Sequence, residues 1–554
     1  MASMQKRNVN GNFYWYIVES KRINGKPTPV VLQYLGSIEN ILMHFKDDKA
    51  TEAEYKSFAH GAVYALMQIA KKAGLLESLG KHLKSQTRDG LKREESLLLV
   101  AIHRVVQPQS KRAFSKWAET TTLPAMLDFK PEQLTSQHFW DQMEGITEEE
   151  LIACEDAITE RVFELYDFNV EKLILDYTNY FSYIATENEQ NTLAQRGHNK
   201  QKRYDLRQYS LAVTTTKDVL FPLCSHIYEG NVPDQTEFPT YIDMLKSRIP
   251  KFDPAKTTLV YDGGSNNRRN LSLIKNMHLH YLCAFSLSVC KKLYNIPLAQ
   301  YKSVRIEENE ILYFRVRQEI WDEERDAVLT FSRDLFNGQL RELDHNIEKT
   351  MAELLELSNK LDDIKSKITR SRESIEQKIE KILNRNYMND VFEVKIIGDS
   401  TAESISWNID SQRKSDIVNR IFGKKLLITD RSDWSTHEIL ETYSDQYIVE
   451  KLFRDTKNPH HFAIRPQYHW TDAKIRVNIF CCLLGLVMTS LLRKEMANHQ
   501  INIENSALID ELSKIRECWI FSKTKKNKSG YKIEKKIERL NDEQEALWEV
   551  IKSL

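Results

Sequence analysis

Two acidic residues of this chain lie where strands of a sheet could bring carboxylates together. Asp176 lies within the apolar run 172–178, which is typical of a buried strand, and Asp262 follows a second apolar run at a Gly-Gly turn. A bare carboxylate in an apolar strand is unfavourable unless a partner neutralises it, and a divalent cation is a common partner. Asp-Gly is also an ordinary turn dipeptide, so turn chemistry alone can explain Asp262.

A third carboxylate, Glu450, belongs to a run of periodically spaced polar residues. Tyr443, Glu450 and Lys457 are seven residues apart, a step that drifts only about 20° around a helix. Gln446 and Arg454 continue the same stripe. Taken alone, the stripe also fits a solvated helix face on which Glu450 and Arg454 form an ion pair.

The elements around these residues predict a mixed α/β sheet covered by helices. Strands are expected at 172–178, 210–216, 220–228, 257–264, 280–286 and 425–430, with helices at 236–248, 268–276, 436–457 and 472–494. Hairpin strands followed by alternating strands and helices are typical of this fold class. The apolar run 479–492 is too short to span a bilayer, and we interpret it as part of a buried helix.

Three other regions have distinct patterns. Residues 13–18 and 29–35 predict strands of a small β-unit with an Asn-Gly turn, and a helical region follows over about 54–167. Residues 339–385 contain neither Gly nor Pro, and apolar residues recur in them at heptad spacing: Ile347, Leu354, Leu361, Ile368, Ile375 and Ile382. The heptads predict a coiled coil, formed either between subunits or as a hairpin within one chain.

The composition excludes several classes of protein. Lys plus Arg and Asp plus Glu both total 79 of 554 residues, so any nucleic-acid-binding surface must come from local segregation of charge. Seven cysteines without a CxxC pair argue against a disulfide framework and a zinc ribbon, and indicate a reducing, intracellular compartment. The sequence has no P-loop and no dinucleotide-binding fingerprint, so no nucleotide cofactor is implied.

The order of the elements and the spacing on the last helix resemble the DDE transposases of insertion sequences. The similarity is to the insertion-sequence-four superfamily, whose signature is Tyr-x2-Arg-x3-Glu-x6-Lys. This chain has Tyr443-x2-Gln446-x3-Glu450-x6-Lys457, with Gln in place of Arg. Asp176-Tyr-Thr resembles the family's first Asp block, and Asp262-Gly-Gly-Ser resembles its second-Asp turn.

This resemblance implies an RNase-H-like sheet, interrupted by an insertion, that carries out metal-dependent phosphoryl transfer. Asp176, Asp262 and Glu450 would hold two Mg²⁺ ions, for which Mn²⁺ can substitute, with Asp176 bridging both. Such an enzyme cuts the ends of an insertion sequence and joins the 3′-OH ends to target DNA. Contacts to DNA would come from the helix face: Tyr443, Gln446, Arg454 and Lys457.

The implied partners are double-stranded DNA, as terminal inverted repeats and target, and a second copy of the chain, at least on DNA. No membrane is implied, and the implied location is the prokaryotic cytoplasm, at the nucleoid. The expected regions are an N-terminal β-hairpin unit (1–45), a helical region that binds DNA ends (46–165), the first part of the catalytic core (166–290), the insertion (291–423), the second part of the core (424–495) and a basic C-terminal region (496–554).

Two alternatives remain open from the residues. A nuclease of the same fold would cut DNA without integrating it. A non-catalytic protein would organise DNA through the coiled coil and basic tracts such as residues 523–539, which hold eight basic and two acidic residues. The second alternative leaves the three carboxylates unexplained.

Overall fold

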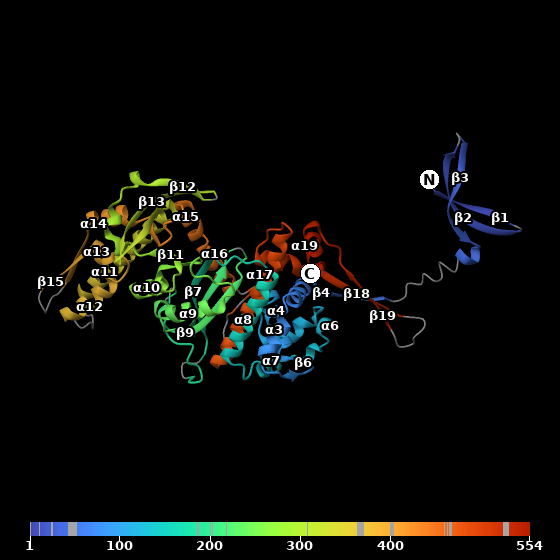
Figure 1. Ribbon diagram of the computed structural model, residues 1–554, viewed down its shortest axis with the longest axis horizontal. Helices are drawn as coiled ribbons and strands as arrows, with labels where there is room; N and C mark the ends of the chain where they lie inside the picture. Colours follow the sequence, from blue (N-terminus) through green and yellow to red (C-terminus); the bar gives the residue numbers. More distant parts are fainter. Residues whose placement is uncertain are drawn as a thin grey trace. The chain divides into compact units, whose positions relative to one another are not determined.

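The computed structural model describes residues 2–9, 11–23, 26–41, 53–184, 188–199, 201, 203–217, 219–306, 308–362, 371–398, 404–458, 460–462, 464, 468–523 and 531–554 (Figure 1). The chain forms two compact units. One unit comprises Met1–Tyr64, Lys116–Pro131 and Asp510–Ser553, and the other comprises Ala65–Ser115 and Glu132–Ile509.

A mixed sheet organises the second unit, and in the described part of the chain it has nine strands. Their order is β12 (Lys302–Ile306), β13 (Asn309–Ile320), β14 (Glu323–Phe331), β17 (Lys424–Thr429), β11 (His280–Phe285), β10 (Thr258–Tyr261), β7 (Lys172–Ser182), β8 (Arg207–Thr216) and β9 (Pro222–Glu229). β10 runs parallel to both β7 and β11, and the other neighbouring pairs are antiparallel. The predicted mixed α/β sheet with flanking helices is confirmed.

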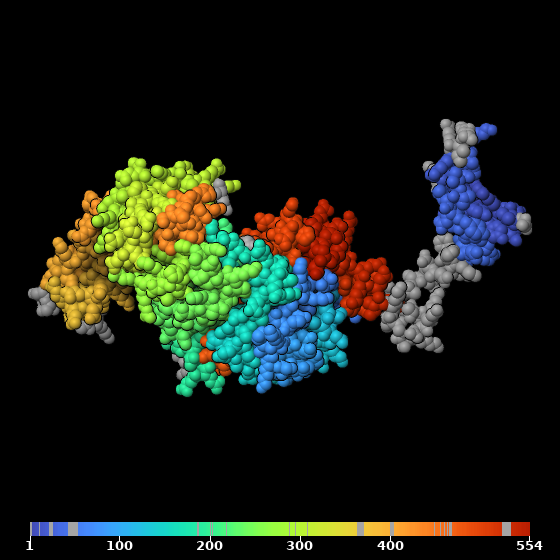
Figure 2. Space-filling view, viewed as in Figure 1, coloured from blue at the N-terminus to red at the C-terminus, as the bar shows by residue number. Residues whose placement is uncertain are grey.

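Helices connect and cover these strands. They include α9 (Asp234–Arg248), α10 (Arg268–Asn276), α15 (Thr436–Ser444), α16 (Gln446–Lys457) and α17 (Asp472–Asn498). By length and composition α17 could cross a membrane, but 94% of its most apolar window is buried inside the fold. It is therefore a core helix, as the apolar run predicted. α15 reaches the surface against strand β12 (Figure 2).

The predicted single helix over 436–457 is wrong, because the chain forms two helices there. α15 ends at Ser444, Asp445 is its C-terminal cap, and α16 begins at Gln446. Asp favours helix ends over helix interiors, and the Asp445 carboxylate forms an ion pair with Lys217 at 3.0 Å. Tyr443 therefore lies on α15, whereas Glu450 and Lys457 lie on α16.

The heptad region forms two helices, α11 (Arg333–Asp362) and α12 (Arg372–Leu383). Ser371 caps α12 with an extended backbone, so no continuous helix runs through the region, and Ile368 lies outside the described residues. Leu354, Leu361 and Ile375 are buried in one hydrophobic cluster, and Arg385 forms an ion pair with Glu353. This arrangement favours the hairpin within one chain over a coiled coil between subunits, and coiled-coil geometry itself stays a prediction.

The expected insertion has two parts in the structure. Strands β12, β13 and β14 extend the main sheet. The heptad helices pack instead with α13 (Met388–Val391), α14 (Ser411–Ile421), β15 (Phe392–Ile397) and β16 (Ser404–Ile409). Trp407 packs with this cluster.

The expected helical region does contain helices: α2 (Gly61–Lys72), α3 (Leu75–His82), α4 (Arg93–Val106), α5 (Phe114–Ala118), α6 (Leu123–Leu127), α7 (Ser136–Gln142) and α8 (Glu148–Leu165), with a short hairpin of β5 (Thr87–Arg88) and β6 (Leu91–Lys92). Its expected first residues form a strand instead. β4 (Ala53–Ala59) pairs with β18 (Arg516–Lys523), which also pairs with β19 (Tyr531–Ile537). Two helices complete the C-terminal region, α18 (Asn505–Ser513) and α19 (Asp542–Lys552).

The N-terminal β-unit has one strand more than predicted. β1 (Ala2–Val9), β2 (Asn12–Ile23) and β3 (Lys26–Gly36) form an antiparallel sheet with β2 in the centre.

Candidate active site

Asp176 lies on strand β7, and Asp262 directly follows β10, the parallel strand beside it. The register of β7 and β10 pairs Leu175 with Tyr261, and the aspartate is the next residue on each chain. Asp262 keeps an extended backbone, with φ −80° and ψ 162°. Because register neighbours on parallel strands lie about 4.8 Å apart and point to the same face, the two carboxylates share one face of the sheet.

Local hydrogen bonds orient both aspartates. The Asp176 carboxylate accepts a hydrogen bond from the backbone N–H of Tyr177 at 2.8 Å, and the Asp262 carboxylate accepts one from that of Gly263 at 2.7 Å. A Cβ at Gly263 would lie 2.9 Å from the carbonyl oxygen of Ala284 on β11. Glycine is thus needed at this position, because the turn packs closely against the end of the next strand.

Helix α16 covers the sheet face that carries Asp176. Val449 of α16 is buried in one cluster with Ile174 of β7, and the hydroxyls of Tyr180 and Thr456 are 2.6 Å apart. Ile174, Asp176 and Tyr180 point to the same face because side chains alternate along a strand. The packing of α16 therefore places its residues over Asp176.

Lys457, at the end of α16, contacts the same strand. Its ammonium group donates a hydrogen bond to the hydroxyl of Thr178 and lies 5.4 Å from the centroid of the Tyr180 ring. Thr178 is two residues from Asp176 on β7, so Lys457 supplies a cation close to that carboxylate.

The charges of all three carboxylates raise the pKa of the Tyr443 hydroxyl. This side chain is buried, packs with Val260 of β10, and has no hydrogen-bond partner for its hydroxyl among the described residues. Burial raises the pKa of Tyr443, and the charges of Asp262, Glu450 and Asp176 raise it further. Because such repulsion weakens with distance, all three carboxylates lie within the range over which their charges reach the Tyr443 hydroxyl.

Lys425 is a residue of the site that the sequence did not indicate. It lies on β17, and its ammonium nitrogen is 4.4 Å from the centroid of the Tyr443 ring. Burial lowers the pKa of Lys425, and the carboxylates of Asp262 and Glu450 act in the opposite direction. No signal in the sequence links this lysine to the other residues of the site.

The polar stripe of α16 differs from a solvated, ion-paired face. Glu450 is exposed, yet within the described part of the chain no ion pair joins it to Arg454. Gln446 is only 6% exposed, and Arg454 is exposed. The ion pair that the solvated-face explanation requires is therefore not formed, and Gln446 is a buried residue at the start of α16.

The donor set of this site suits a hard divalent cation. Three carboxylates offer oxygen ligands, the kind that Mg²⁺ and Mn²⁺ prefer. Among the described residues, no group of three or more His, Cys, Asp or Glu side chains is arranged to hold one ion together. Two ions that each take two of the carboxylates, with water and phosphate as further ligands, are compatible with this arrangement.

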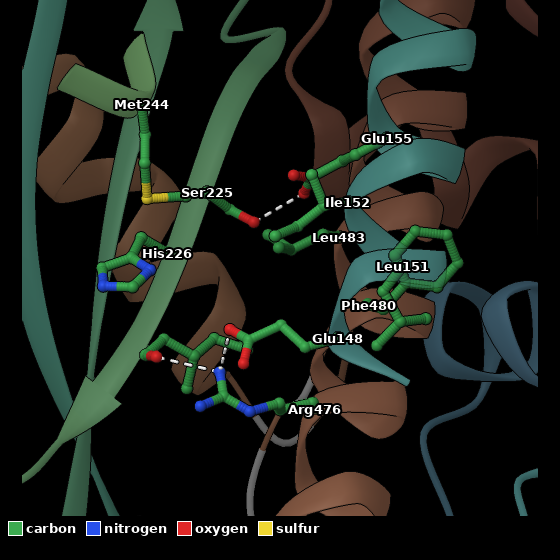
Figure 3. A pocket seen from close by; sticks show the side chains of 11 residues that line it. Glu148, Leu151, Ile152, Glu155, Ser225, His226, Met244, Arg476, Phe480 and Leu483 are labelled. Atoms are coloured by element: carbon green, nitrogen blue, oxygen red, sulfur yellow. Dashed lines mark hydrogen bonds and ion pairs between the residues drawn. The ribbon is translucent and has the colours of Figure 1, made fainter. Parts of the chain in front are cut away.

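A separate pocket lies between β9, α8 and α17, and its polar side chains are already paired (Figure 3). The hydroxyl of Ser225 donates to Glu155 at 2.5 Å, and the Arg476 guanidinium donates to Glu148 at 2.6 Å. None of the three carboxylates of the candidate site lines this pocket.

No protein-family model matches the chain, and no curated protein is detectably similar to it in sequence. Among solved structures, the chain is similar to a piggyBac transposase in a synaptic complex with hairpin DNA, with a TM-score of 0.34 and 7% identity. The similarity covers 81% of this chain and 76% of that one. It is weak.

Proposed function

We propose that this protein is a DDE-type DNA transposase that cuts the ends of an insertion sequence and joins them to target DNA. The observation that carries the proposal is the strand register that sets Asp176 beside Asp262, with α16, the helix of Glu450, packed against strand β7. Carboxylates held close together are costly without a counter-charge, and the cations of a phosphodiester-cleaving metal centre would supply it.

The topology supports an RNase-H-like core. Strands β9, β8 and β7 form an antiparallel meander, and β10 and β11 continue the sheet in parallel with β7, with α9 and α10 in the two crossovers. This is the order of elements that the sequence resemblance implied: a strand with the first Asp, a hairpin, a helix, and a strand that ends at the second Asp.

Each residue has a role in this proposal. Asp176, Asp262 and Glu450 would hold two Mg²⁺ ions, which supply Lewis-acid stabilisation of the attacking and leaving oxygens. Lys457 and Lys425 would hold phosphate oxygens of the DNA strand, because each presents an ammonium group beside the carboxylates. The Tyr443 hydroxyl, which has no partner among the described residues, would donate a hydrogen bond to phosphate.

A strand-transfer assay tests this function. The substrates are pre-cleaved DNA ends, taken from the sequences that flank the coding region, and a supercoiled target plasmid. We expect Mg²⁺-dependent joining, and its loss in Glu450→Gln. Glu441→Gln, a change on the neighbouring helix α15, is the matched control and should join normally.

Two outcomes would contradict the proposal. Cleavage of intact ends without joining would indicate the nuclease alternative. Joining that persists in Glu450→Gln would remove the helix carboxylate from the reaction.

A further inference from the structure

The N-terminal sheet carries three tyrosines and an arginine on one face. The strand register sets Arg7 opposite Tyr14 and Tyr34 opposite Tyr16, and residues opposite one another in antiparallel strands point to the same side. The ring centroid of Tyr34 is 5.0 Å from that of Tyr16 and 6.0 Å from that of Tyr14. The Arg7 guanidinium lies 5.0 Å from the Tyr16 ring centroid. We call these four residues the tyrosine face.

The tyrosine face is open at its centre. Tyr34, whose ring contacts both other tyrosines, is 55% exposed. An exposed cluster of large rings is unusual in a soluble unit and marks a binding surface. The opposite face of the sheet also pairs a cation with an exposed ring. The Lys6 ammonium lies 3.7 Å from the centroid of the Phe13 ring, and Phe13 is 51% exposed.

Charge favours a nucleic acid over an apolar partner. Residues 1–36 contain five basic residues (Lys6, Arg7, Lys21, Arg22 and Lys26) and one acidic residue (Glu19). A second copy of this sheet would bring like charges together, which opposes association. A nucleic acid supplies both partners that the face needs, because phosphates pair with cations and flat bases stack on rings.

The geometry points to one class of nucleic acid. A duplex keeps the faces of its bases inside the stack, whereas a single strand exposes them. We propose that the tyrosine face binds single-stranded DNA, with a base stacked on Tyr34 and a phosphate beside Arg7. This inference adds a DNA contact to the proposed transposase, but the binding itself needs neither metal nor the carboxylates.

Fluorescence anisotropy of the full chain in EDTA tests this inference, with a labelled 20-nucleotide oligothymidine and a 20-base-pair duplex as probes. We expect Tyr34→Ala to weaken binding of the single strand about fivefold or more, the loss of one stacked base, and to change duplex binding less. Tyr34→Phe keeps the ring and should bind normally. Tyr204→Ala is the matched control, because Tyr204 is 54% exposed but lies elsewhere in the chain.

The proposal fails if Tyr34→Ala binds the single strand as tightly as the wild type, or if the duplex loses as much affinity. Light scattering at the same concentrations tests the alternative that a second copy of the chain binds to the tyrosine face. A dimer that dissociates in Tyr34→Ala, with DNA affinity unchanged, would identify a protein interface and overturn the inference. Because no cleavage occurs in EDTA, none of these results depends on whether the proposed transposase reaction is correct.

Discussion

The ammonium nitrogen of Lys425 lies 4.4 Å from the centroid of the Tyr443 ring. The charges of Asp262 and Glu450 raise the pKa of both groups. When it is protonated, Lys425 is a cation within electrostatic range of these two carboxylates. It therefore offsets part of their mutual repulsion and also opposes the entry of a second cation.

Removing the charge of Lys425 should strengthen metal binding and weaken DNA binding. In Lys425→Met we expect Mn²⁺ to bind the DNA-free protein more tightly, by about fivefold for a screened interaction near 1 kcal/mol. DNA binding should weaken because a phosphate contact is lost. Isothermal titration with Mn²⁺ and a DNA-binding assay in EDTA measure the two effects. Unchanged Mn²⁺ affinity would show that Lys425 does not face the metal ligands.

Lys457 should contribute to both DNA binding and cleavage. Lys457→Ala is expected to reduce end binding and cleavage together and to lower the salt slope of binding by about one, the loss of one phosphate contact. Lys451→Ala, on the same helix but paired with Glu504, is the control. Thr178→Val removes only the hydroxyl that Lys457 contacts. If Thr178→Val reproduces every effect of Lys457→Ala, the lysine only fixes α16 on β7.

Lys111 should make the stability of the protein depend on pH. Burial, with help from Arg104, lowers the pKa of Lys111 from 10.5 to about 7. The unfolded chain therefore binds more protons between these values, so stability rises with pH in this window, by about 1.4 kcal/mol per pH unit. Urea unfolding of Lys111→Met at pH 7, 8 and 9 should lack this increment. Parallel stability curves for wild type and variant would contradict the prediction.

The heptad helices should stabilise one chain rather than join two. Leu354 of α11 is fully buried, whereas its neighbour Leu355 is 53% exposed. We expect Leu354→Ala to cost about 2–5 kcal/mol of unfolding free energy and Leu355→Ala no more than about 0.5 kcal/mol. Light scattering should give the same mass for both variants and the wild type. Loss of a dimer in either variant would assign the helices to an interface between subunits.

The sequence predicted most of the sheet that holds the site. The apolar runs in the sequence identified strands β7 and β10. Each run leads to its aspartate, and the pairing of the two strands places Asp176 beside Asp262. Such apolar patterns depend only on residues that are neighbours in the chain, so the strands could be predicted from the sequence alone. That Glu450 joins the two aspartates in one site is a prediction that rests on the family resemblance.

Features that depend on distant partners were missed. At the break between α15 and α16, Asp445 forms an ion pair with Lys217, more than two hundred residues away. β4 was expected to be helical, yet its backbone pairs with β18 near the other end of the chain. Lys425 joins the site only because β17 enters the sheet beside β11. Tertiary contacts override local propensity in these cases.

Counting bound Mn²⁺ by electron paramagnetic resonance tests the central claim most directly, which is that the three carboxylates form a two-metal centre. Wild-type protein with a DNA end should bind two ions, and Asp176→Asn should lose both, because Asp176 is the proposed bridge. Asp243→Asn, an exposed carboxylate on α9, should bind as the wild type. Two ions retained in Asp176→Asn, or no binding by the wild type, would contradict the account.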